Sequence, residues 1–419
     1  MESKKYVVLL QDQNSSAVKK VEREFKVSLT SSENLSSTNK SYDIIDADNG
    51  VLYKNLGVAV MDEPDVEQLE AAVNNDRSPI LYYEEEREFF AVNEMDLINN
   101  VKLKAAELSS LISELESFLN NKPLPQKSLT EMEWGLKAIG IDLAQFTGKG
   151  IDLCVLDTGF DLSHPDFSAR NIEGKSFIPD EVWDRDPYGH GTHCAGTAAG
   201  NVRQDSGKRY GIAGDCNLKI GKVLSNKGKG TTSGIIDAID WALEHKFRII
   251  SMSLASPVKI NEKPSPIFEA VGRKALASNC LLIAAAGNDS KRPAVPLPVG
   301  APANCSSIMA VAAIDSQMRV AAFSNGGINS ANGGNVNVCA PGVDILSARP
   351  VKAPDNLPYT MMNGTSMATP HVAGLAALYM EKFPDLTADK IWELLENTAK
   401  PIQNLKYRDI GSGLIQFVP

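Results

Sequence analysis

Three hydroxyl side chains crowd one short segment of the sequence, Met362–Gly374 (MNGTSMATPHVAG). Thr365, Ser366 and Thr369 follow a glycine and precede a run of small apolar residues. A serine hydroxyl is a poor nucleophile until a base takes its proton, but a serine at a helix start also offers its unpaired backbone N–H to a developing anion. We therefore predict that Ser366 begins a helix and is the reactive hydroxyl. We expect Pro370 in the first helical turn, where no N–H is needed.

Three other polar residues stand at strand ends or helix starts, where apolar packing does not require them. Asp157 ends the run IDLCVLD, His190 opens the small-residue run HGTHCAGT, and Asn288 follows AAAG. A histidine can serve as the base at neutral pH, and a buried carboxylate can orient it. An asparagine amide can donate to the oxyanion of a tetrahedral intermediate. Taken singly, Asp157 and Asn288 could instead be a strand-end cap and a turn cap.

The elements that must position these residues alternate between strands and helices from about residue 131 onward. Apolar runs of strand length, such as RIISMSLA and CLLIAAAGN, are separated by amphipathic helical patterns such as TTSGIIDAIDWALEH. This alternation predicts an α/β fold with a mostly parallel sheet and helices on both faces. In such sheets, functional residues gather at the carboxyl ends of the strands.

The first 94 residues have a different pattern. Short strands and two short helices follow one another in the order βαββαβ, which predicts a small ferredoxin-like α+β domain. This part carries a net charge of −9 out of −10 for the whole chain, which supports a separate unit. We predict three parts: the ferredoxin-like domain 1–94, an amphipathic helix (97–119) with a proline-containing linker over 95–125, and a catalytic domain 126–419.

Composition excludes several classes of function. The chain has no basic patch for nucleic acid and no apolar run of the ~18 residues that a membrane span needs. All six cysteines follow residue 150 without a CxxC pair, so we expect free thiols rather than a zinc site. No signal peptide is apparent, which predicts a cytoplasmic protein as the sequence stands, or a secreted one if a signal was removed.

Four segments together resemble the subtilase (subtilisin-like) serine protease family. They are VLDTGFDLSHPDF, GHGTHCAGT, AAAGN and NGTSMATPHVAG, and the family shares their order of Asp, His and Ser. The resemblance covers about residues 130–419. It implies a serine endopeptidase that works through an acyl-enzyme, with Ser366 as nucleophile, His190 as base and Asp157 as its partner. Asn288 and the Ser366 N–H would hold the oxyanion, and no cofactor is required for the chemistry.

The resemblance also indicates where a peptide substrate would bind. The segment ISMSLAS matches the family's substrate-binding strand, so Ser253, Leu254 and Ala255, together with Gly287, are expected to bind substrate. The family usually has two glycines where this chain has Ala255 and Ser256. This difference bears on the width of the pocket for the residue before the cleaved bond.

The N-terminal domain resembles, more weakly, the inhibitory propeptide of the same family. Its tail YYEEEREFFAVNE is where such a propeptide enters the cleft. The resemblance therefore implies a protease held as a zymogen or inhibited in cis by residues 1–94. The alternative is a catalytically silent subtilase scaffold that acts as a binding protein, which an intact triad argues against.

Other residues near these motifs are interpreted as structural. By the resemblance His193 is structural; we expect Cys194 and His371 to serve in packing. The family also implies a structural calcium ion with Asp166 as a ligand. The nearby loop contains three basic residues, Arg203, Lys208 and Arg209, which disfavour a divalent cation, so no metal ligand is assigned.

Overall fold

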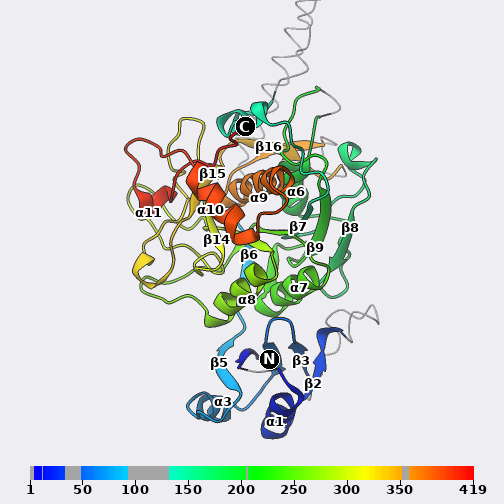
Figure 1. Ribbon diagram of the computed structural model, residues 1–419, viewed down its shortest axis with the longest axis vertical. Coiled ribbons are helices and arrows are strands. Elements are labelled where there is room, and N and C mark those ends of the chain that lie inside the picture. The colour runs from blue at the N-terminus through cyan, green and yellow to red at the C-terminus, as the bar shows by residue number, and fades with distance from the viewer. Residues whose placement is uncertain (1–3, 12, 34–48, 93–131, 204–205, 352–357) are drawn as a thin grey trace, which may run out of the picture.

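The computed structural model describes residues 4–11, 13–33, 49–92, 132–203, 206–351 and 358–419. A small N-terminal sheet domain lies against one side of a larger α/β domain (Figure 1). The predicted linker helix 97–119, and the predicted boundaries at 94/95 and 125/126, lie outside the described residues. Within the described residues, no helix has the length and apolar character to cross a bilayer.

The N-terminal domain is a five-stranded sheet with the order β2-β3-β4-β1-β5. Its elements are β1 (Lys5–Leu10), α1 (Ser15–Phe25), β2 (Ser28–Ser31), β3 (Asn49–Tyr53), β4 (Val58–Asp62), α3 (Val66–Val73) and β5 (Ile80–Glu85). The four strands β3-β4-β1-β5 pair antiparallel as a ferredoxin-like sheet does. Strand β2 is an additional edge strand that pairs parallel to β3.

Both faces of this small sheet are buried. Alternate residues point to opposite faces of a strand, and Val8 packs with helices α1 and α3 while Val7 joins the core of the larger domain. Val58 and Val60 likewise face the larger domain, whereas Ala59 faces the helices. The strands β1 and β4 are apolar on both faces because one face packs on α1 and α3 and the other on the larger domain.

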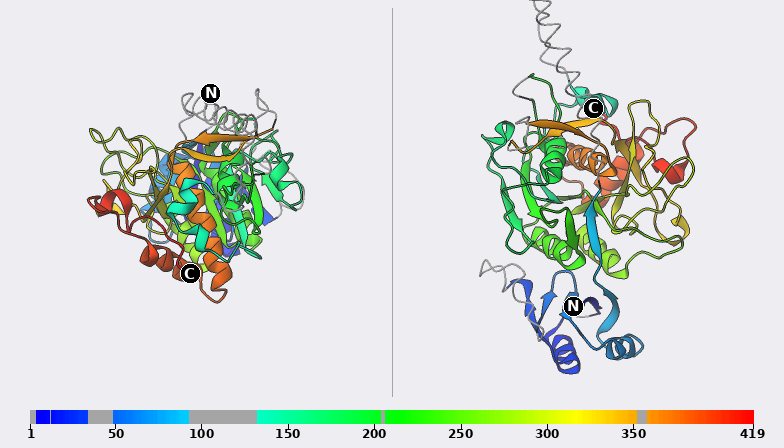
Figure 2. Two further views of the ribbon diagram at one scale, coloured as in Figure 1. Left: turned by 90° about the horizontal axis from the view of Figure 1, so that it is seen from above. Right: turned by 180° about the vertical axis from the view of Figure 1, so that it is seen from behind.

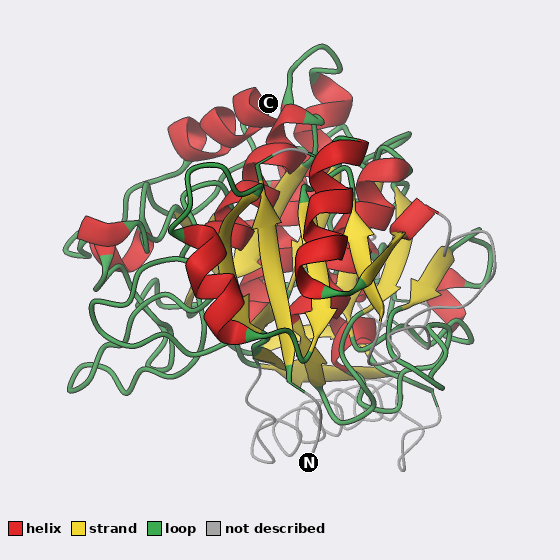
Figure 3. Cartoon of the chain, turned by 90° about the horizontal axis from the view of Figure 1, so that it is seen from below, coloured by secondary structure: helices red, strands yellow, loops and turns green. Residues whose placement is uncertain are grey.

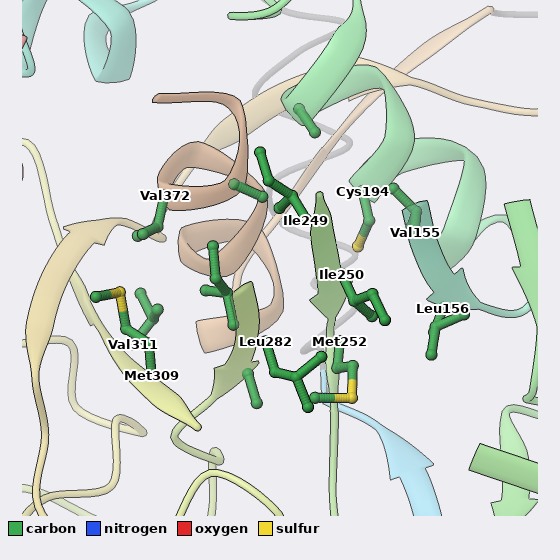
Figure 4. Close-up of a cluster of buried hydrophobic side chains, with 14 of the residues drawn as sticks. Val155, Leu156, Cys194, Ile249, Ile250, Met252, Leu282, Met309, Val311 and Val372 are labelled. Atoms are coloured by element: carbon green, nitrogen blue, oxygen red, sulfur yellow. The ribbon is translucent and has the colours of Figure 1, made fainter. Parts of the chain in front are cut away.

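The larger domain is built on a seven-stranded sheet whose strand pairs are all parallel. Its order is β15 (Val338–Pro341), β14 (Met309–Ile314), β13 (Leu281–Ala285), β11 (Ile249–Met252), β7 (Asp152–Asp157), β9 (Asn217–Lys222) and β8 (Glu173–Ser176). This confirms the predicted α/β class. Figure 4 shows the apolar side chains of β7, β11, β13 and β14 in the core, with Cys194 and Val372 reaching it from two helices.

Helices cover the sheet on both faces (Figure 3). Helices α6 (His190–Ala199) and α9 (Thr365–Lys382) pack against each other and on β7, and α10 (Ala388–Thr398) packs on α9. On the other face, α7 (Thr232–Glu244) contacts β7 and α8 (Pro266–Ala277) contacts β13. The smaller elements are α5 (Trp134–Ala138), α11 (Tyr407–Ile410), the 3-10 turns Ile141–Leu143, Pro165–Phe167 and Ser330–Asn332, and the hairpin β16 (Ile345–Ala348) with β17 (Tyr359–Met362).

Helices α7 and α8 are also the surface on which the N-terminal domain rests (Figure 1). From there strand β6 (Glu88–Ala91) runs up along the larger domain (Figure 2, right). It lies between β10 (Lys229–Thr231) and β12 (Leu254–Ala255) in a three-stranded sheet. The tail of one domain thus becomes the central strand of a sheet in the other.

All six cysteines are buried free thiols, as predicted. Burial raises the pKa of Cys280 to about 12 and that of Cys154 well above its ordinary value. These thiols stay neutral and act as small apolar groups.

Candidate active site

The polar residues singled out in the sequence converge at the carboxyl ends of three neighbouring strands. Asp157 is the last residue of β7, Ser253 follows β11, and Asn288 lies three residues beyond β13. These strands are adjacent in the sheet, so their ends meet at one edge. Helices α6 and α9 begin at the same edge and bring His190 and Ser366.

His190 and Asp157 form a fully buried pair. The distance from His190 Nδ1 to Asp157 Oδ1 is 2.7 Å, and neither side chain is exposed to solvent. The Thr158 N–H donates to the same carboxylate oxygen at 2.7 Å, which fixes the plane of the carboxylate. A β-carbon at Gly191 would lie 2.2 Å from the Gly159 carbonyl oxygen, so only glycine lets α6 approach β7 this closely.

Ser366 is the second residue of α9 and is fully buried. Its hydroxyl donates to the Ser253 carbonyl at 3.0 Å, and the Ser253 hydroxyl donates back to the Ser366 carbonyl at 2.8 Å. Among the bonds of the described residues, the hydroxyl therefore pairs with Ser253 rather than with His190. The Cys194 Sγ lies 3.8 Å from His190 Nδ1 and donates to the Ser366 carbonyl at 3.6 Å.

The position of Pro370 differs from the prediction. Helix α9 begins at Thr365, so Pro370 lies in its second turn, inside the helix. An interior proline removes the hydrogen bond to the carbonyl four residues earlier, which here belongs to Ser366. Ser253 and Cys194 supply donors to that free carbonyl, so the proline creates the attachment point that fixes the backbone of Ser366.

Asn288 uses both ends of its amide. Its Oδ1 accepts from the Thr365 N–H at 3.0 Å and from the Thr365 hydroxyl at 2.8 Å. Its Nδ2 therefore points away from α9 and donates to the carbonyl of Val92 at 2.8 Å. Gly287 has a positive φ of 102°, and its N–H donates to the Thr365 hydroxyl at 3.1 Å. Thr365 thus orients the amide of Asn288, a role that the sequence analysis did not predict.

The tail of the N-terminal domain pairs with two strands of the larger domain. Leu254 is opposite Ala91, Ala255 is opposite Phe90, and the Ala91 N–H donates to the Gly228 carbonyl at 3.0 Å. Leu254 and Ala255, two of the predicted substrate-binding residues, therefore pair with the backbone of strand β6. Of the other two predicted substrate-binding residues, Ser253 bonds to Ser366 and Gly287 lies beside Asn288.

Phe89 is the apolar anchor of this tail. It has no exposed surface and packs edge-to-face on Phe268 of α8, with ring centroids 5.6 Å apart. Phe90 points the other way, is half-buried, and has the Lys229 ammonium 5.4 Å from its ring centroid.

Two carboxylates of the tail form hydrogen bonds at the starts of helices α7 and α8. Glu86 accepts from the Ser233 N–H at 3.0 Å in the first turn of α7. Glu84 accepts from the Ser265 hydroxyl at 2.7 Å at the start of α8, and burial raises the pKa of Glu84. Carboxylates at helix N-termini are favourably placed relative to the helix dipole. Two of the three consecutive glutamates in the tail, Glu84 and Glu86, thus bond at helix starts, whereas Glu85 forms a salt bridge with Lys4.

Two further buried histidines, His193 and His371, bond to backbone carbonyls. His193 Nε2 lies 2.9 Å from the Ile345 carbonyl, and burial lowers the pKa of His193 to about 3. His371 Nδ1 lies 2.7 Å from the Met367 carbonyl, and burial lowers the pKa of His371 to about 4. Both rings are neutral at physiological pH.

Among the described residues, one cluster has metal-ligand types in reach of one another: Asp157, His190 and Cys194, with ligand atoms within 4.8 Å. A thiol must lose its proton to bind a metal firmly. Burial raises the pKa of Cys194 well above its ordinary value, so the thiol stays protonated. This donor set does not fit a resident metal ion.

Asp166, the residue that the family resemblance suggests as a calcium ligand, is bonded by two tyrosine hydroxyls. Asp166 accepts from the Tyr210 hydroxyl at 2.9 Å and from the Tyr359 hydroxyl at 2.8 Å. Two nearby backbone carbonyls also have partners, because Arg209 donates to Gly211 at 3.0 Å and to Ile212 at 2.6 Å. Calcium needs such oxygens free, so these residues do not fit the ion.

Comparison with known proteins places this geometry in context. A family model described as the subtilase family matches residues 148–413. The chain is 38% identical to subtilisin E of Bacillus subtilis (strain 168) over 284 residues, which cover 67% of this chain and 68% of that protein. It is 36% identical to subtilisin DY of Bacillus licheniformis over 280 residues, 67% of this chain and 94% of that protein. It is 34% identical to M-protease of Shouchella clausii (strain KSM-K16) over 360 residues, 84% of this chain and 86% of that protein.

Proposed function

The chain belongs to the subtilase family and is a subtilisin-like serine endopeptidase, and from this premise we propose the role of each site residue. Ser366 Oγ attacks the carbonyl carbon of a peptide bond while His190 accepts its proton. His190 then gives that proton to the leaving amine, and water hydrolyses the ester on Ser366 by the same route. Asp157 holds the tautomer of His190 and stabilises the imidazolium.

The observation that carries this assignment is the contact from Asn288 Nδ2 to the Val92 carbonyl. A peptide carbonyl lies on the amide expected to stabilise the oxyanion, and its chain is paired as a strand with Leu254 and Ala255. A bound peptide thus has its carbonyl next to the first turn of α9, where Ser366 stands. In the structure the Ser366 hydroxyl bonds to the Ser253 carbonyl, and we propose that rotation about its Cα–Cβ bond directs it to His190 for the reaction.

We also propose that residues 1–94 inhibit the enzyme in cis. An added strand gains affinity from main-chain hydrogen bonds largely regardless of sequence. Phe89 adds a fully buried anchor, and Glu84 and Glu86 add hydrogen bonds at the starts of α8 and α7. The match to M-protease, over 84% of this chain, cannot be contained in residues 126–419, which supports an N-terminal domain shared with that relative.

The same contact predicts where the chain cuts itself. The Val92 carbonyl is the one held by Asn288, so the bond that follows Val92 is the expected cleavage point. Intact mass spectrometry of the purified chain over time should show a fragment that ends at Val92. The Ser366→Ala chain should stay whole. A cut at another position would refute the register proposed here.

The alternative, a silent scaffold that binds peptides, predicts a different result. The wild-type chain would remain uncut and would not turn over any peptide, even with the tail displaced. A protease that stays inhibited would also remain uncut, but it would gain activity when the tail is weakened. Phe89→Ala therefore separates these two cases, because it removes the anchor without touching the triad.

Docking of the tail can be measured directly in the uncut Ser366→Ala chain. Hydrogen exchange at the amides of β6 should accelerate strongly with Phe89→Ala, because a fully buried aromatic side chain contributes about 3–5 kcal/mol. Phe90→Ala is the matched control, since Phe90 is half-buried on the other face of the strand. Equal effects of the two substitutions would contradict an anchoring role for Phe89.

A further inference from the structure

The loop before His190 contains a buried carboxylate that the proposed triad does not use. Asp186 is 3% exposed. Its Oδ1 accepts from the Thr158 hydroxyl at 2.8 Å and from the Gly189 N–H at 2.9 Å. Its Oδ2 accepts from both the N–H and the hydroxyl of Thr192, each at 2.8 Å. Each oxygen of this carboxylate thus has two donors.

The hydrogen directions in this network are determined by its other members. The Thr158 hydroxyl accepts from the Gly191 N–H at 2.8 Å, and the Thr192 hydroxyl accepts from the Asp161 N–H at 3.0 Å. Each hydroxyl therefore directs its own hydrogen to Asp186. An ionised carboxylate accepts all four bonds, whereas an amide or a protonated acid presents a hydrogen to at least one donor. Burial by itself raises the pKa of Asp186, and these bonds oppose that rise.

Asp186 connects the two segments that carry the proposed base and its partner. Thr158 directly follows Asp157 at the end of β7, and its N–H fixes the oxygen that meets His190. Gly189 precedes His190 at the start of α6. We infer that Asp186 is a positioning residue that sets the contact between Asp157 and His190, an inference that rests on the catalytic function proposed above.

The test is Asp186→Asn in the full chain, allowed to activate itself. Its kcat should fall about 10–10²-fold, because small misplacements of catalytic groups cost rates of this order, while KM changes little. Rates are expressed per active site by fluorophosphonate titration, so loss of folded protein does not count. A lower unfolding midpoint with unchanged kcat per site would mean that Asp186 is only structural, and would overturn the inference.

Thr158 supplies a second, independent pair of variants. Thr158→Ser keeps the bridging hydroxyl and should retain a kcat near that of the wild type, whereas Thr158→Val removes it and should reproduce the loss. This pair decides the question even if Asp186→Asn does not fold. In the double variant Asp186→Asn/Thr158→Val, the losses should not add, because both break one network.

The outcomes also separate this inference from the proposed function. If neither the wild-type chain nor its Phe89→Ala variant cuts a peptide, the catalytic proposal itself fails. If the wild type is active and Thr158→Val keeps full kcat per site, the catalytic proposal stands and the role of Asp186 is wrong.

Discussion

Removing the Asn288 side chain tests how the site treats the charge that develops during reaction. Asn288→Ala deletes the donor that lies 2.8 Å from a bound peptide carbonyl. It also deletes the acceptor for the N–H and hydroxyl of Thr365, at 3.0 and 2.8 Å, at the start of α9. A loss of activity could therefore come from the oxyanion or from a loosened helix start, and the two must be separated.

The expected size of the effect follows from the change in charge. In the ground state the amide donates to a neutral carbonyl, a bond with a net contribution of about 0.5–1.5 kcal/mol. In the transition state the same donor meets an oxyanion, and losing it costs about 10²–10³-fold in kcat, or about 2.7–4 kcal/mol. We therefore expect kcat to fall by that factor, with KM raised at most about tenfold.

Steady-state kinetics on a peptide substrate, per titrated active site, provides the measurement. Asn288→Asp is the matched control, because it keeps an oxygen for Thr365 but replaces the donor with an acceptor. If the donor matters, Asn288→Asp is at least as impaired as Asn288→Ala. If Asn288→Asp is active while Asn288→Ala is not, the amide anchors α9 and the oxyanion argument is refuted. A main effect on KM would mean that Asn288 shapes the binding site instead.

Three further predictions can be checked with standard assays. Ser366→Ala should lower peptide turnover to below about 1% of wild type, since loss of a triad member costs about 10⁴-fold or more, and higher turnover would point to another nucleophile. Burial lowers the pKa of His371 to about 4 from 6.5, so the unfolded chain binds a proton that the folded chain does not, and stability is lost as pH falls from about 6.5 to about 4. His371→Gln should reduce this slope in unfolding midpoints, and an unchanged slope would contradict the prediction. Chelation of calcium should leave the unfolding midpoint unchanged while Arg209→Met lowers it, and a calcium-dependent rise that Asp166→Asn abolishes would contradict this.

The part of the candidate site that could be predicted from the sequence is the set of polar residues at strand ends and helix starts. Asp157 and Asn288 are polar residues that interrupt or directly follow apolar runs, and the resulting expectation that they meet at one sheet edge agrees with the strand order β13-β11-β7. The ferredoxin-like character of the N-terminal domain was likewise accessible from the order of short strands and helices along the chain. The extra strand β2 was not, because its four residues carry no distinctive pattern.

Other features depend on contacts between distant parts of the chain. Pro370 lies in the second turn of α9 because Ser253 and Cys194 satisfy the carbonyl that it frees, and no local pattern around Pro370 shows this. Two partners of the Asp166 carboxylate are tyrosines, Tyr210 and Tyr359, that lie 44 and 193 positions away. The sequence could indicate that the loop disfavours calcium, but not which groups take its place.

Of the three hydroxyls in Met362–Gly374, we expect that of Ser366 to do the chemistry. Fluorophosphonate labelling of the self-activated chain, followed by peptide mass spectrometry, tests it most directly. We predict that the label maps to Ser366 alone, because only this hydroxyl has a base to take its proton. A label on Thr365 or Thr369, or an activated chain that takes up no label, would contradict the account.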